Sequence, residues 1–83
     1  MSDSKQNMHV IVASDVSNGR DGIGIEVYLD EEMVLEIFRD DTKKEREVTL
    51  YKKDLPLSLV ENAIEVFKMK IPWEFIQVDV PSA

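Results

Sequence analysis

Two hydrophobic periods divide the chain. From residue 8 to residue 52, apolar and polar side chains alternate in short runs, which is typical of β-strands. From residue 56 to residue 71, apolar side chains recur every three or four positions, which is typical of an amphipathic helix. The pattern predicts an α+β fold: an antiparallel meander of about four strands in the order β-β-β-β-α, with one C-terminal amphipathic helix packed on its aliphatic face. We expect strands over residues 8–14, 23–29, 33–39 and 47–52.

The helix is bounded by two prolines. Pro56 suits the first helical position, because its missing N–H would be unpaired there. Pro72 ends the helix near residue 69 or 70, since the residue before a proline resists helical geometry. One apolar stripe of the helix is expected to face the sheet, formed by Val60, Ala63, Ile64, Phe67 and Ile71.

The strand register follows from the aliphatic positions. A three-residue loop at residues 30–32 places Leu29 opposite Met33. Every aliphatic then shares one face, with further pairs Val27–Leu35, Ile25–Ile37, Ile37–Val48 and Leu35–Leu50. A two-residue loop would set aliphatics opposite Glu36 or split them between faces, so we reject it.

The second face of the sheet carries aromatic residues. The register predicts a row of Tyr28, Val34 and Tyr51, with Phe38 nearby and opposite Gly24. If nothing covers this row, it is an apolar patch of the kind that marks a partner site. The alternative is that the apolar tail, residues 73–80, folds over it. That tail is either a short fifth strand or an extended segment packed on the domain.

The same register sets Glu26 opposite Glu36 on the second face. Paired carboxylates can share a proton and serve acid–base chemistry or a small ligand. Two glutamates on an open sheet can also extend into water. Thr49 is expected beside Glu36 and able to donate a hydrogen bond to it.

Length and charge narrow the function classes. The 83 residues suffice for one small domain, residues 8–83, after a disordered N-terminal tail at residues 1–7. Ten basic and 17 acidic residues give a net charge of −7, which argues against a protein that coats nucleic acid or anionic lipid. The basic residues of the hairpin have two interpretations: a weak contact with nucleic acid, or a loop exposed to solvent. They are Lys43, Lys44, Arg46, Lys52 and Lys53.

The residue types that most metal sites and nucleophilic active sites require are absent or rare in this sequence. There is no cysteine and only one histidine, His9, so the sequence predicts no catalytic residue, no metal site and no cofactor. No secretory signal and no apolar run near the roughly 20 residues of a spanning helix are present, so we expect a cytoplasmic protein without a membrane partner.

The sequence therefore favours a small non-enzymatic domain that binds another protein, or a second copy of itself, through the second sheet face. The alternatives are a ligand or acid–base site at Glu26 and Glu36, and a nucleic-acid contact through the basic residues of 43–53.

Overall fold

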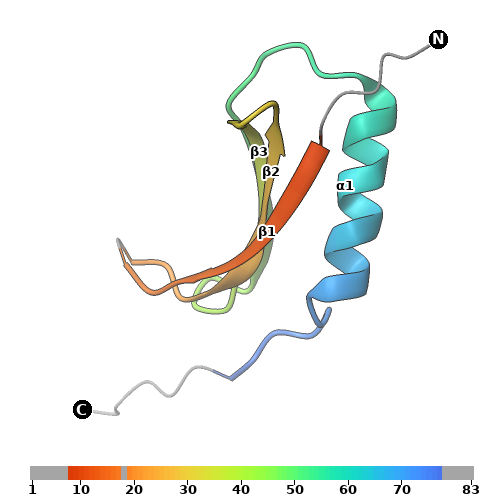
Figure 1. Cartoon of the computed structure of the whole chain (residues 1–83). Helices are drawn as coiled ribbons and strands as arrows, with labels where there is room; N and C mark the ends of the chain where they lie inside the picture. The colour runs from red at the N-terminus through yellow and green to blue at the C-terminus, as the bar shows by residue number, and fades with distance from the viewer. Residues whose placement is uncertain (1–7, 18, 78–83) are drawn as a thin grey trace, which may run out of the picture.

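Four strands form one antiparallel sheet, and a single helix follows them. The computed structural model describes residues 8–17 and 19–77, so the predicted N-terminal tail lies outside the described residues. The strands are adjacent in chain order, β1-β2-β3-β4. Figure 1 shows the helix α1 on one side of this sheet, where it contacts β2 and β3. The predicted α+β meander is confirmed, with the bounds β1 (Met8–Asp15), β2 (Gly22–Leu29), β3 (Glu32–Asp40), β4 (Glu45–Leu50) and α1 (Leu57–Lys70).

The central register is the predicted one. Ile25 pairs with Ile37 and Val27 with Leu35, while Val48 and Leu50 pair with these two β3 residues from β4. Because opposite residues of an antiparallel pair share a face, these aliphatics lie together on the side that faces α1. The alternate residues, Glu26 and Glu36 among them, lie on the other side.

The β2–β3 hairpin differs from the prediction. Asp30 and Glu31 form a two-residue turn with φ values of 48° and 72°. Such left-handed pairs match the twist of the flanking strands. Leu29 therefore pairs with Glu32, and the predicted pair Leu29–Met33 is wrong. The register shifts between Val27 and Tyr28, where β3 holds one extra residue as a β-bulge.

The extra residue is Val34. The bulge directs its side chain toward α1 beside that of Leu35, and both are fully buried in the core. The expectation that Val34 lies on the second face in a row with Tyr28 and Tyr51 is therefore wrong. Simple alternation assigns neighbouring residues to opposite faces, and a bulge breaks that rule.

The helix buries a stripe slightly rotated from the predicted one. Leu59, Ala63 and Phe67, spaced four residues apart, are the buried positions of α1. Ile64 was expected in the stripe but is 38% exposed. The Pro56 carbonyl oxygen accepts hydrogen bonds from the amides of the first turn, and Pro56 itself precedes the helix rather than opening it.

The chain after α1 returns to the helix-facing side of the sheet. Trp73 stacks edge-on against Phe67, and its carbonyl oxygen accepts hydrogen bonds from the Arg46 guanidinium at 2.7 and 3.2 Å. Arg46 also lies over the Trp73 and Phe75 rings. Residues 73–77 form no strand, and the rest of the predicted fifth strand lies outside the described residues. The described tail therefore does not cover the second face.

No helix in the described part of the chain has the length and apolarity needed to cross a membrane.

Candidate functional site

The side of the sheet opposite α1 is called the open face here. Strand alternation and the observed pairing bring its side chains into cross-strand rows, such as Ile11–Glu26–Glu36–Thr49 and His9–Tyr28–Met33. No helix among the described residues lies on this side (Figure 1). Its strand-paired residues are His9, Ile11, Ala13, Asp15, Gly22, Gly24, Glu26, Tyr28, Met33, Glu36, Phe38, Asp40, Glu45, Glu47 and Thr49.

Tyr28 is held in place from two sides. The His9 imidazole stacks on its ring with 5.1 Å between centroids and an interplanar angle of 4°. Its hydroxyl donates a hydrogen bond to Glu26 Oε1 at 2.9 Å. That hydrogen bond is the main cause that raises the pKa of Tyr28 above its ordinary value of 10.0, and burial adds to it. The phenol therefore stays protonated at neutral pH and orients the Glu26 carboxylate.

Glu36 has a different partner. Arg20, from the β1–β2 loop, folds back over the open face and places Nη2 3.2 Å from Glu36 Oε2. The same guanidinium lies 3.7 Å from the Phe38 ring centroid and 3.7 Å from an Asp15 oxygen. Phe38 is only 2% exposed as a result of this cover and of its contact with Gly24.

The two glutamates are opposite each other, as predicted, and each has its own hydrogen-bond partner. Tyr28 binds one and Arg20 binds the other. No contact joins the two carboxyl groups in the described part of the chain, and Thr49 sits opposite Glu36 without displacing Arg20. This arrangement suits recognition of charge better than transfer of a shared proton.

The four residues expected to form an exposed interface do not gather on one surface. Val34 is in the core, Phe38 lies under Arg20, and Tyr28 is half-buried. Only Tyr51 is well exposed, at 54%. One apolar residue that was not predicted for this surface, Ile11, is exposed on the open face, at 45%. The sequence pattern does not predict the face on which Ile11 lies, because three β-branched residues in a row give β1 no alternation. The pairing of Ile11 with Glu26 places Ile11 on the open face.

The basic residues are also dispersed. Lys43 and Lys44 lie in the β3–β4 turn, where Lys43 is 3.7 Å from Glu47. Lys52 and Lys53 follow the other end of β4. At roughly 3.3 Å per residue, the length of β4 keeps these two pairs apart, so they do not make one phosphate-binding patch. Arg46 lies between them, on the side of the helix, bound to the tail.

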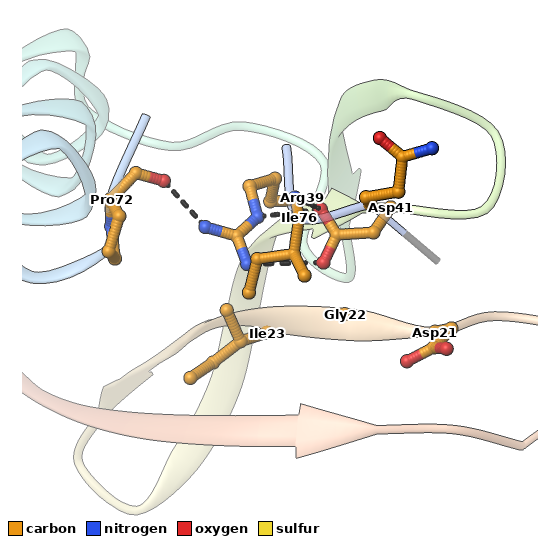
Figure 2. A pocket seen from close by; sticks show the side chains of 8 residues that line it. Asp21, Gly22, Ile23, Arg39, Asp41, Pro72 and Ile76 are labelled. Carbon is orange, nitrogen blue, oxygen red and sulfur yellow. Dashed lines mark hydrogen bonds and ion pairs between the residues drawn. The ribbon is translucent and has the colours of Figure 1, made fainter. Parts of the chain in front are cut away.

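A hollow of about 550 Å³ lies where β2, β3 and the tail meet. Figure 2 shows the Arg39 guanidinium at its wall, with Nε and Nη2 donating to the two Asp41 carboxylate oxygens at 2.9 and 3.1 Å. Nη1 donates to the Pro72 carbonyl oxygen at 2.7 Å, and Asp41 also accepts from the Ile76 amide. Arg39 and Asp41 are 1% and 4% exposed. Through their bonds to the Pro72 carbonyl and the Ile76 amide, Arg39 and Asp41 hold the tail against the sheet. Because their polar atoms also bond to each other, few of them are free to bind a ligand. The sequence pattern does not reveal this buried pair, since Arg39 ends a strand as a solvated residue often does.

Within residues 8–17 and 19–77, no group of three or more histidine and acidic side chains is arranged to hold a metal ion. Comparisons of the chain with protein-family models, with curated proteins and with solved structures find no match. The candidate site therefore rests on the geometry of the open face alone.

Proposed function

We propose that this protein is a non-enzymatic interaction domain that binds another protein through the open face. The observation that carries the proposal is the asymmetry of the sheet. One side has α1 packed on its central strands β2 and β3, while the other has no helix on it among the described residues and exposes Ile11 at 45% beside the half-buried Glu26. Exposed apolar groups beside oriented polar groups are typical of protein interfaces.

The chemistry of the face favours a partner with basic side chains. The guanidinium of Arg20 already lies on this face, between the Phe38 ring and the Glu36 carboxylate, so the face accommodates a basic group. Glu26, the neighbouring carboxylate, has no basic partner among the described residues and is held by Tyr28. The net charge of −7 supports the same choice, because complementary potentials speed encounter. The partner therefore presents a lysine or arginine beside an apolar side chain that packs on Ile11.

Two substitutions test the proposal. Ile11→Asp removes the apolar contact and Glu26→Lys reverses the charge that receives the partner's base. The matched controls are Leu57→Asp and Glu61→Lys on exposed positions of α1. The assay is affinity capture from cell extract with each purified variant, followed by titration of the captured partner.

We expect one partner that binds the wild type and both controls alike, and that binds each open-face variant at least about tenfold more weakly, the loss of roughly 1.4 kcal/mol. A partner retained by both open-face variants, or the absence of any partner of the wild type, would contradict the proposal.

A further inference from the structure

Arg20 is held on the open face by few of its hydrogen-bond donors. Its guanidinium donates from Nη2 to Glu36 Oε2 at 3.2 Å and forms a looser ion pair, of 3.7 Å, with Asp15. Among the described residues, Arg20 Nε is buried without a hydrogen-bond partner. Arg39, in contrast, donates hydrogen bonds at 2.7, 2.9 and 3.1 Å and is 1% exposed. Arg20 therefore uses a small part of its donor capacity, whereas Arg39 is well satisfied.

The groups around Arg20 nevertheless have the geometry of a guanidinium-binding site. The guanidinium lies flat enough on the Phe38 ring to place its carbon 3.7 Å from the ring centroid. Gly22 and Gly24 leave room for that ring, since an added Cβ would come within 3.2 and 3.0 Å of it. Glu36 supplies a carboxylate beside the ring. An aromatic face next to a carboxylate favours a guanidinium over an ammonium group.

Carboxyl groups outnumber the basic group at this end of the open face. Asp15, Gly22 and Asp40 form one cross-strand row, next to the row that holds Phe38. Hydrogen bonds from Ser17 lower the pKa of Asp15, so its carboxylate is ionised at neutral pH. Asp40 Oδ2 is buried and has no hydrogen-bond partner in the described part of the chain. A single guanidinium thus faces an excess of carboxyl groups, which attracts a further cation.

The backbone of Arg20 does not depend on where its side chain lies. The Arg20 amide donates to the Ser17 carbonyl oxygen at 2.9 Å, and Gly19 takes the φ of 77° that this turn requires. The Arg20 side chain is 28% exposed. The side chain can therefore leave the Phe38 ring for solvent while the turn and the sheet stay as they are.

We propose that Phe38 and Glu36 form a binding site for an arginine of the partner, and that Arg20 occupies this site until the partner's arginine displaces it. The displacement rests on the proposed function, because it needs a partner on the open face. Glu26 lies opposite Glu36, so the partner presents two neighbouring basic side chains, one to Glu26 and an arginine to Glu36. Arg20 is then an internal competitor that lowers the affinity of the open face for this partner.

The site itself is tested without any partner. Arg20→Ala vacates it, and methylguanidinium is titrated while NMR follows the Phe38 ring signals. We expect saturable binding at least about tenfold tighter than that of methylammonium, and at least about tenfold tighter than to the wild type, where Arg20 competes. Adding Glu36→Gln should weaken the binding by about tenfold. Arg46→Ala is the control, since it removes the other guanidinium that lies on aromatic rings, and it should behave like the wild type.

Three results of this titration overturn the site: no saturable shift in a folded Arg20 variant, equal binding of methylammonium, or binding that Glu36→Gln leaves unchanged. The amide spectrum reports whether Arg20→Ala is folded. Arg20→Gln, which keeps most of the apolar stem, takes its place if that spectrum is lost.

The displacement is tested with the partner captured by the wild type. Arg20→Ala removes the competitor and should lower the dissociation constant of the partner by about tenfold, whereas Arg46→Ala should leave it unchanged. A dissociation constant that stays the same or rises in Arg20→Ala overturns the displacement. Absence of any partner overturns the proposed function and the displacement together, while the methylguanidinium titration still decides whether the site exists.

Discussion

The buried pair of Arg39 and Asp41 offers the sharpest test of how the tail is held. Arg39→Met keeps most of the apolar stem but removes three hydrogen bonds, two to Asp41 and one to the Pro72 carbonyl oxygen. The Asp41 carboxylate, 4% exposed, then keeps the Ile76 amide but no cation. Removing one partner of a buried ion pair costs about 3–5 kcal/mol. An 83-residue domain has a total stability of about 4–12 kcal/mol, so the variant should lose a quarter of that stability or more.

The assay is urea unfolding followed by circular dichroism for the wild type, Arg39→Met, Asp41→Asn and the double variant. Because the second substitution removes a charge that the first has already left unpaired, the double variant should lose clearly less than the sum of the two single losses. Arg46→Met is the control, since Arg46 also bonds to the tail but from a partly exposed position, and should cost about 1–2 kcal/mol. A loss under about 1 kcal/mol for Arg39→Met, or additive losses, would refute the reasoning.

Three further predictions concern the core, the sheet and one titration. Phe67→Ala should lower the free energy of unfolding by about 3–5 kcal/mol in urea, whereas Met69→Ala, at an 80% exposed position, should change it by less than about 0.5 kcal/mol; equal effects would contradict the observed helix face. Gly24→Ala should cost about 1–3 kcal/mol in the same assay, because its new Cβ would collide with the carbonyl oxygen of the opposite strand and lie 2.7 Å from a neighbouring Cα; an unchanged midpoint would refute the close approach. Glu26→Gln should lower the pKa of Tyr28 toward 10.0, followed by the ring signals in NMR. The folded-state pKa of Tyr28 is raised, so the stability that this hydrogen bond contributes is present below pH 10 and is lost as the pH rises through the folded-state pKa; a wild-type titration at the ordinary value would contradict it.

The sheet was predictable because its signal is local. Alternation in residues 23–29 and the need to keep aliphatics on one side set the pairs Ile25–Ile37 and Val27–Leu35. The pairing of Glu26 with Glu36 and of Gly24 with Phe38 follows from the same register. These pairs needed no knowledge of the tertiary contacts.

The hairpin shows where alternation stops being sufficient. Two requirements compete there: a two-residue turn, which suits the twist of the strands, and a register that keeps the aliphatics together. The chain satisfies both by inserting Val34 as a bulge. The sequence gives one indication of the bulge: Met33, Val34 and Leu35 are three apolar residues in a row, which breaks the period of two. Without the third dimension, that run does not say which residue is the extra one.

The positions of the side chains in the candidate site are set by tertiary contacts more than by the sequence pattern. Arg20 covers Phe38 from a loop 18 residues earlier, and no periodicity predicts where a loop side chain folds. Arg39 is buried because a segment more than 30 residues away returns to it, where the Pro72 carbonyl oxygen accepts from Arg39 and the Ile76 amide donates to Asp41. Ile11 reaches the open face only through its pairing with β2. In each case the deciding contact joins distant parts of the chain.

The most direct test of the open face as a binding surface is site-specific photo-crosslinking in cell extract. A photo-reactive amino acid replaces Ile11 in one variant and Met69, on an exposed position of α1, in the other. We predict that the variant labelled at position 11 gives a covalent adduct with one protein partner and that the variant labelled at position 69 gives none. Adducts at position 69 without any at position 11 would contradict the account.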